Sequence, residues 1–141
     1  MYTVAESIHP RRPFKSLPKA VLTALLALVC GAASTSARAD GEIKKGAEVF
    51  ATQCAECHSL KEGKHKKGPS LFALLGRPSA GLAGVAYSDA MKASKWTWSA
   101  EKIDIYISAP KAALPGGTMK FDGLTDAHAR ADLLAFLASV K

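Results

Sequence analysis

The stretch Cys54-Ala55-Glu56-Cys57-His58 decides how the rest of this sequence is interpreted. Its two thiols are separated by two residues, and an imidazole follows the second thiol directly. This spacing is typical of the covalent attachment of a c-type haem, in which each cysteine forms a thioether with one haem vinyl group. The motif therefore predicts one covalent haem c on Cys54 and Cys57, with His58 as an axial ligand of the iron. The cofactor would supply the redox chemistry, and the protein would position and tune it.

Residues 1–39 have the pattern of a cleavable secretory signal peptide. Basic residues precede an apolar run over residues 20–33, and Ala37-Arg38-Ala39 ends in the A-x-A pattern that signal peptidase prefers. The sequence therefore predicts cleavage before Asp40, a functional domain over residues 40–141, and a location in the bacterial periplasm. Since the apolar run is short for a transmembrane span, we expect no stable membrane insertion after cleavage. An uncleaved membrane anchor is the alternative.

Two other export routes have partial support. Arg11-Arg12 resembles the start of a twin-arginine signal. That route carries folded cargo, whereas haem is attached to an unfolded chain after export, so we favour the general route. Cys30 suggests a lipoprotein site, but Val29 stands where such a site has a small residue.

The charge balance argues against nucleic-acid binding. The whole chain has 19 basic and 12 acidic residues and a net charge of +7. The 1–39 leader carries five of the basic residues and one of the acidic ones, which leaves a net charge of +3 on residues 40–141. A nucleic-acid-binding domain would need a strongly basic face.

Apolar spacing predicts a helix at each end of the domain. Residues Ile43 to Cys54 present apolar side chains at three- and four-residue intervals, with Asp40 as the expected N-cap and Glu42 in the first turn. A second apolar face runs from Leu133 to Val140. We expect Thr125 to cap that helix and Asp126 to lie in its first turn.

Shorter helices are predicted between these two. A middle helix would contain Ile103 and Tyr106, begin after the cap Ser99, and stop before Pro110. Residues 69–75 would form another, closed by Gly76, and Ser88 would cap a further short one. No alternating run of β-branched residues predicts a strand. The expected fold class is all-α, with about four to five short helices and long loops.

The second axial ligand is expected to be a methionine. A soft thioether favours reduced iron and raises the redox potential. Outside the leader the chain has only Met91 and Met119. Met119 lies in the glycine-rich stretch Pro115–Phe121, which can approach a flat cofactor closely, whereas Met91 lies in a predicted helix. We therefore predict Met119 as the ligand opposite His58.

Across residues 41–140 the chain resembles the class I cytochromes c, and it looks most similar to mitochondrial cytochrome c and its short periplasmic bacterial relatives. Matching segments occur in order along the whole domain. They are Lys45-Gly46, Phe50, Gly63 to Leu71, Gly76-Arg77, Tyr87 to Ala90, Trp98, Tyr106, Pro110, Pro115-Gly116, Met119, Phe121, Gly123 and Arg130 to Leu137.

The resemblance implies a role for each matched site residue. The Pro69 carbonyl would accept the second ring N–H of His58 and fix its tautomer. Gly46 would let its helix pass close to Phe136. Further residues would surround the cofactor: Arg77, Tyr87 and Trp98 at the propionates, Tyr106 near the Met119 sulfur, and Phe121 over the exposed haem edge. Trp96 has no expected cofactor role, and His65 and His128 are expected to be surface or hydrogen-bonding residues.

Three departures from the family pattern affect this expectation. Met91 replaces a common asparagine, which predicts a drier site and a shifted potential. Gly117-Thr118 replaces Thr-Lys, so one propionate contact is displaced. The ring of lysines around the haem edge is thinned, because Glu48, Gln53 and Thr118 replace common lysines, while Lys66 and Lys111 remain.

The resemblance implies a soluble, monomeric electron carrier rather than an enzyme. Its partners would be redox proteins. A quinol–cytochrome c reductase or a dehydrogenase would donate the electron, and an oxidase, a peroxidase or a photosynthetic reaction centre would accept it.

Three other classes of protein are alternatives. Cys54, Cys57, His58 and His65 could ligate a structural zinc ion, although adjacent ligands make poor tetrahedral geometry. A thioredoxin-like dithiol would require a βαβ pattern, which the sequence lacks. A haem enzyme or gas sensor would require Met119 to bind the iron weakly.

Overall fold

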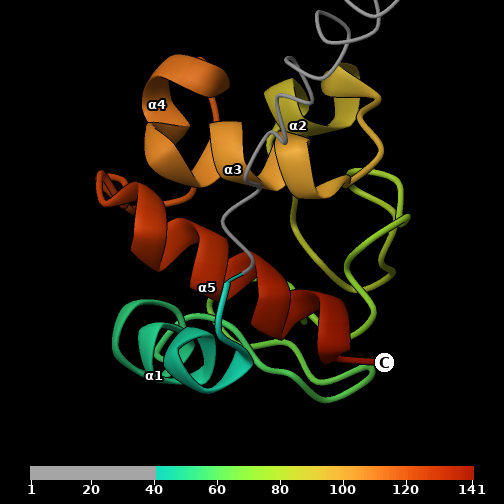
Figure 1. Cartoon of the computed structure of the whole chain (residues 1–141). Coiled ribbons are helices and arrows are strands. Elements are labelled where there is room, and N and C mark those ends of the chain that lie inside the picture. The colour runs from blue at the N-terminus through green and yellow to red at the C-terminus, as the bar shows by residue number, and fades with distance from the viewer. Residues whose placement is uncertain (1–40) are drawn as a thin grey trace, which may run out of the picture. The chain divides into compact units, whose positions relative to one another are not determined.

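A computed structural model describes residues 41–141 (Figure 1). The predicted signal peptide, its cleavage site and the predicted cap Asp40 lie outside the described residues. Within these residues the chain forms five helices: α1 (Ile43–Gln53), α2 (Asp89–Ser94), α3 (Ala100–Ser108), α4 (Pro110–Ala113) and α5 (Ala127–Ser139). The only β-type pairing in this part of the chain is an isolated bridge between Pro78 and Thr97. The prediction of an all-α fold with four to five short helices is confirmed.

The two terminal helices, α1 and α5, pack directly against each other. Phe50 and Phe136 meet with their ring centroids 5.8 Å apart, and the Glu42 backbone N–H donates to the Asp132 carboxylate over 2.7 Å. Figure 1 shows α5 between α1 and the α3–α4 pair. Five buried side chains form the core where these helices meet: Phe50, Leu74, Ile103, Leu133 and Leu137.

Side-chain caps fix where three of the helices begin. Ser88 accepts from the Met91 N–H over 3.2 Å and Ser99 from the Lys102 N–H over 3.1 Å, as predicted. The predicted cap Thr125 is wrong, because the Asp126 carboxylate caps α5 by accepting from the N–H groups of His128 and Ala129. Asp126 keeps an extended backbone and so remains outside the helix. Glu42 occupies the N-cap position of α1, rather than its first turn, without a side-chain cap bond.

The predicted helix over residues 69–75 is wrong, because this segment forms turns. The Ser70 hydroxyl accepts from the Phe72 N–H over 3.1 Å and so competes with a helical bond. Ala73 adopts φ +45°, which an α-helix cannot contain. Its N–H donates instead to the Val140 carbonyl beyond α5, over 3.2 Å. Tertiary hydrogen bonds therefore replace local helical ones here.

Pro110 acts at a helix boundary in two ways. It stops α3, as predicted, and it also occupies the first position of α4, where a missing N–H costs nothing.

Among residues 41–141, none of the helices has the length and apolar character needed to cross a membrane.

Candidate haem-binding site

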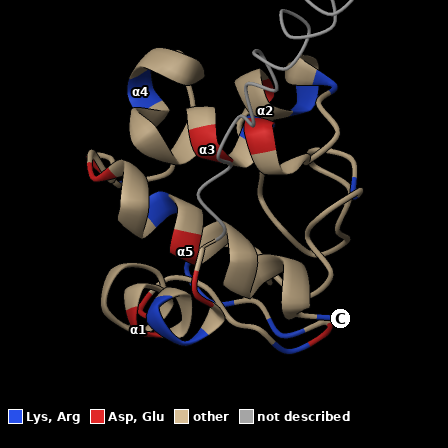
Figure 2. Cartoon of the chain, in the orientation of Figure 1, with Lys and Arg blue, Asp and Glu red and all other residues tan. Residues whose placement is uncertain are grey.

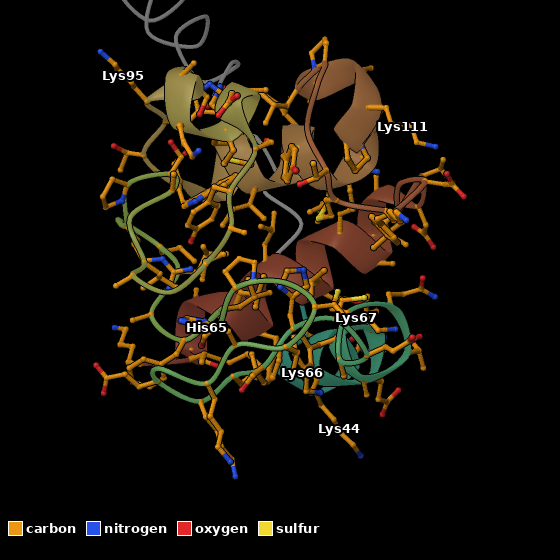
Figure 3. The ribbon with its side chains drawn as sticks, turned by 180° about the vertical axis from the view of Figure 1, so that it is seen from behind. Lys44, His65, Lys66, Lys67, Lys95 and Lys111 are labelled. Atoms are coloured by element: carbon orange, nitrogen blue, oxygen red, sulfur yellow. The ribbon has the colours of Figure 1, made fainter. Side chains whose placement is uncertain are left out.

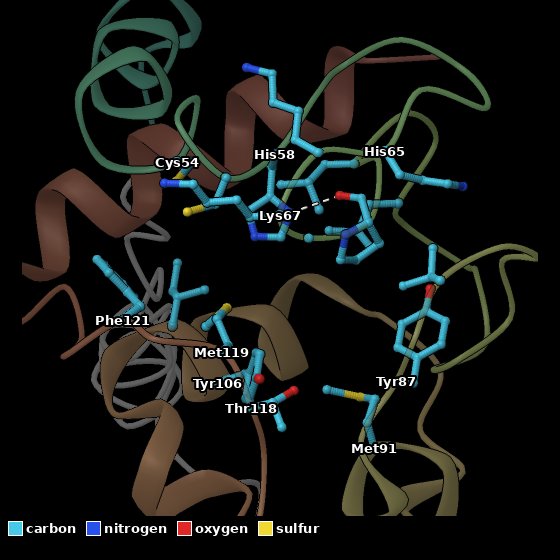
Figure 4. A pocket seen from close by; sticks show the side chains of 18 of the residues that line it. Cys54, His58, His65, Lys67, Tyr87, Met91, Tyr106, Thr118, Met119 and Phe121 are labelled. Atoms are coloured by element: carbon cyan, nitrogen blue, oxygen red, sulfur yellow. Dashed lines mark hydrogen bonds between the residues drawn. The ribbon is translucent and has the colours of Figure 1, made fainter.

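A cavity of about 640 Å³ lies inside the domain (Figure 4). Its lining comes from the end of α1, the long loops, α2, α3, the 118–121 segment and α5. The structure brings together all ten site residues that the sequence predicted: Cys54, Cys57, His58, Pro69, Arg77, Tyr87, Trp98, Tyr106, Met119 and Phe121. Residues from distant parts of the chain therefore surround one space.

The end of α1 places both motif cysteines at this cavity. A tight turn follows the helix, in which the N–H groups of Cys57 and His58 both donate to the Cys54 carbonyl, over 3.1 and 2.9 Å. Both thiols are free and half-buried. Burial raises the pKa of the Cys54 thiol to about 11, and the neighbouring Cys57 adds to this shift. The turn therefore presents two thiols and one imidazole to the same space.

The His58 ring is held in one orientation and one tautomer. Its Nδ1 lies 2.7 Å from the Pro69 carbonyl oxygen (Figure 4). Since a carbonyl can only accept, Nδ1 donates and Nε2 keeps its lone pair in the neutral ring. Burial lowers the imidazole pKa, the Pro69 bond opposes that effect, and nearby Lys66 lowers the pKa further. The predicted contact between His58 and Pro69 is confirmed.

Gly68 gives the His58 ring the space that it occupies. A Cβ on Gly68 would lie 2.5 Å from the ring carbon Cε1, which is closer than van der Waals contact allows. Any other residue at this position would push the ring or the loop aside. The residues around the motif therefore provide both the His58 imidazole and, because Gly68 has no side chain, the space that the ring occupies.

A methionine sulfur faces His58 from the other side of the cavity. Figure 4 shows Met119 pointing toward His58, with Tyr106, Thr118 and Met91 on the same side as Met119. Met119 packs against the buried cluster of Met91, Tyr106 and Leu114. The predicted proximity of Tyr106 to Met119 is consistent with this packing.

The Arg77 guanidinium lies at the edge of the cavity and is partly committed to the backbone. It donates to the carbonyl oxygens of Phe72 and Ser70, over 2.8 Å each. Burial is the main cause that lowers its pKa, and Tyr87 opposes the shift. These two bonds fix the position of the positive charge beside the cavity.

Several lining residues were not predicted as site residues. They include apolar side chains from loops and core helices: Leu71, Leu74, Val85, Ile103, Leu124, Leu133 and Leu137. Leu133 was predicted only as part of an apolar helix face. Val85 and Leu124 lie in loops, where no helical periodicity indicates which way a side chain points.

The donor set and its surroundings match a haem. Two thiols, an oriented imidazole, a facing thioether and apolar sides are what a covalently attached, axially ligated porphyrin requires. Within residues 41–141, no group of three or more His, Cys, Asp or Glu side chains is arranged to hold a metal ion. His65, the fourth ligand of the alternative zinc site, instead accepts from the Ser70 N–H over 3.1 Å. The geometry thus favours haem over zinc.

These features define a small all-α haem protein, and comparison with known proteins gives the family. Residues 43–141 match the Cytochrome c family. The chain is 43% identical over 100 residues to cytochrome c of Gibberella zeae, spanning 70% of this chain and 94% of that protein. It is 42% identical over 99 residues to cytochrome c of Stellaria longipes, spanning 70% and 92%. Against cytochrome c of Chlamydomonas reinhardtii it is 44% identical over 98 residues, spanning 69% and 88%.

The chain belongs to the cytochrome c family. It is a single-haem electron carrier rather than an enzyme, with one covalently attached haem c, for which Cys54 and Cys57 provide the C-x-x-C-H motif.

Charged residues of both signs are interspersed over the described domain (Figure 2). Lys67 forms an ion pair with Glu56, and Lys111 pairs with Asp122 over 2.9 Å. Lys66 donates to the Ala55 carbonyl. In Figure 3, Lys66 and Lys67 lie together, whereas Lys111 lies away from them. The positive charge of Lys67 and Lys111 is therefore partly offset by neighbouring carboxylates.

Proposed function

We propose that this protein is an exported one-electron carrier whose haem iron is ligated by His58 and Met119. The observation that carries the proposal is the placement of the two side chains on opposite sides of one apolar cavity, next to Cys54 and Cys57. Ligation by both residues would leave no coordination site of the iron open to a substrate. This arrangement favours electron transfer over the chemistry of a haem enzyme or gas sensor.

Haem c supplies a one-electron couple at its iron when it is bound. The protein's own groups then set the conditions. His58 presents a neutral Nε2 because Pro69 holds the proton on Nδ1. The Met119 thioether favours the reduced state. Apolar side chains such as Leu71 and Phe121 keep water away from the cofactor.

Three polar residues at the cavity are proposed to hold the haem propionates. Arg77 would neutralise their charge, and Tyr87 and Trp98 would donate hydrogen bonds. All three line the cavity. Buried carboxylates without such partners would be costly, so this role is consistent with the partly buried guanidinium.

The proposed partners are redox proteins that dock briefly at the haem edge. A quinol–cytochrome c reductase or a dehydrogenase would deliver the electron, and an oxidase, a peroxidase or a reaction centre would remove it, with the carrier acting as a monomer. Because Glu56 and Asp122 offset Lys67 and Lys111, docking to an acidic partner should depend only weakly on ionic strength.

A stopped-flow salt series tests this docking proposal. The second-order rate constant for electron transfer to an acidic redox partner should fall only gently as salt increases. The variant Glu56→Gln frees Lys67 and should steepen the dependence. A steep dependence for the unmodified protein, or no difference in the variant, would contradict the proposal.

Export by a cleavable signal over residues 1–39 is also part of the proposal, with the bacterial periplasm as the location. It is supported by the basic start and apolar run of that segment, and the family match begins only at residue 43. N-terminal sequencing of protein purified from a periplasmic extract should begin at Asp40. A mature chain that starts at Met1, or that is recovered only from membranes, would refute this part.

A further inference from the structure

Three aromatic rings form a continuous contact between the haem cavity and the protein surface. The Trp98 and Tyr106 ring centroids are 5.4 Å apart. Trp96 contacts both of them, with centroid separations of 5.8 Å in each case and edge-on geometry. Each ring therefore touches the other two.

The three rings differ in what they face. Trp98 and Tyr106 line the cavity, and Tyr106 is 7% exposed. Trp96 is half-buried and does not line the cavity, so its accessible part lies on the outer surface. The Lys102 ammonium lies over the Trp96 ring, 4.9 Å from its centroid. Trp96 is thus the outer end of the chain of rings, beside a positive charge.

The chemistry of these side chains suits one-electron oxidation. Indole and phenol give up an electron more readily than other neutral side chains except thiols, and Trp96 is the member of this group that faces outward. A cation over an indole attracts small anions to the same place. An anionic one-electron oxidant would therefore meet Trp96 first.

We propose that Trp96 is an entry point for oxidising equivalents, which pass through Trp98 and Tyr106 to the haem. This rests on the proposed function, because the reduced haem iron is the final electron donor. The oxidant class is a small anionic radical, represented by the carbonate radical anion. The relay would protect the protein surface from lasting oxidation by such radicals.

The electron balance is simple. Trp96 gives one electron to the carbonate radical anion, which becomes carbonate, and the oxidised indole releases its N–H proton to water. The indole then regains one electron from the reduced iron through the two inner rings, and takes a proton back from water. The net change is one electron moved from ferrous iron to the oxidant.

Pulse radiolysis of the reduced holoprotein in carbonate buffer tests this inference. The indolyl radical absorbance should form and then decay in a first-order step, at the rate at which the ferrous haem band is lost. In Trp96→Phe, the amplitude of this coupled step should fall to less than half of its value in the unmodified protein. Trp96→Tyr should restore part of that amplitude. Both variants must show the unmodified visible spectrum, which confirms their fold.

Two controls test separately the role of Lys102 in capturing the radical and the role of the reduced iron in the decay of the indolyl radical. Lys102→Gln should slow capture of the carbonate radical more than Lys95→Gln, which removes the same charge from an exposed neighbour. In the oxidised protein no electron is available, so the indolyl radical should persist. Equal coupled amplitudes in Trp96→Phe and the unmodified protein, or equally fast first-order decay in the oxidised protein, would overturn the relay. A protein without a reducible c-type spectrum would instead overturn the proposed function.

Discussion

Gly46 in α1 and Asp132 in α5 are in direct backbone contact. A Cβ on Gly46 would lie 2.0 Å from the Asp132 carbonyl oxygen and 2.7 Å from the Phe136 Cβ. Because the first of these atoms belongs to the backbone of a helix, it cannot rotate aside. The absence of a side chain at Gly46 therefore sets how closely the two terminal helices cross.

The first prediction concerns Gly46→Ala. Alanine favours a helix over glycine by about 1 kcal/mol, but the clash must separate α1 from α5, and overpacking typically costs about 1–3 kcal/mol. We expect a net loss of unfolding free energy, measured by denaturant titration of the holoprotein. The matched control is the exposed Ala51 in the same helix, where Ala51→Gly should destabilise by about 1 kcal/mol through propensity alone. A Gly46→Ala variant as stable as the parent would contradict the contact.

The second prediction concerns loss of haem attachment in Cys54→Ser/Cys57→Ser. Without the haem, the apolar side chains around the cavity of about 640 Å³ lose their packing partner and face water. Whole domains are stable by only about 5–15 kcal/mol. The haem-free chain should therefore lose its cooperative thermal transition and most of its helical circular dichroism. Glu56→Ala, which keeps both thiols, should retain both properties. A haem-free variant with a normal cooperative transition would rule out this dependence on the cofactor.

The third prediction concerns Met91, which is 9% exposed and packed with Tyr106 and Leu114. Met91→Asn places an amide in an apolar site, which favours entry of water and costs about 1–3 kcal/mol of stability. The redox midpoint should shift because the surroundings of the haem become more polar. Met91→Leu keeps the site apolar and should leave the midpoint near its original value. A redox titration in which Met91→Asn causes no shift would show that Met91 does not tune the site.

The fourth prediction is a pH effect at the Lys67–Glu56 pair. The hydrogen bond and positive charge of Lys67 hold the pKa of the Glu56 carboxyl below its ordinary value of 4.5. The pKa of Glu56 is lower in the folded state than in the unfolded state. The pair therefore stabilises the fold fully at pH values above the unfolded-state pKa, and this stabilisation is lost as the pH falls through the folded-state pKa. Both groups are fully exposed, so the gain is small. Carboxyl NMR titration should show the Glu56 pKa rising in Lys67→Gln; an unchanged pKa would exclude the pairing in solution.

The residues predicted for the site lie together in the structure, whereas two predictions of local structure are wrong. Thioether attachment and axial ligation need particular residue types, so Cys54, Cys57, His58 and Met119 could be predicted without any knowledge of the fold, and the structure places all four at one cavity. The predictions for 69–75 and Thr125 failed for a different reason. Ser70 and Asp126 each form side-chain hydrogen bonds that decide the backbone conformation, and helical periodicity does not report such bonds.

The three aromatic rings of Trp96, Trp98 and Tyr106 show a second limit of sequence reasoning. Trp96 and Trp98 are two residues apart, but Tyr106 lies on the next helix, and only the fold brings the three rings together. Nothing in the sequence indicated a cofactor role for Trp96. Trp96 is half-buried and packed against Trp98 and Tyr106, and these contacts suggest the additional role proposed above.

The central claim is that His58 and Met119 close both faces of one covalently bound haem iron. It is tested most directly by the absorption spectrum of the purified mature protein in both oxidation states. We predict sharp c-type bands on reduction, retention of the haem after denaturation, and the weak near-infrared band of methionine-ligated ferric iron, which Met119→Leu should abolish. Binding of carbon monoxide by the reduced protein at neutral pH, or a near-infrared band that survives in Met119→Leu, would contradict the claim.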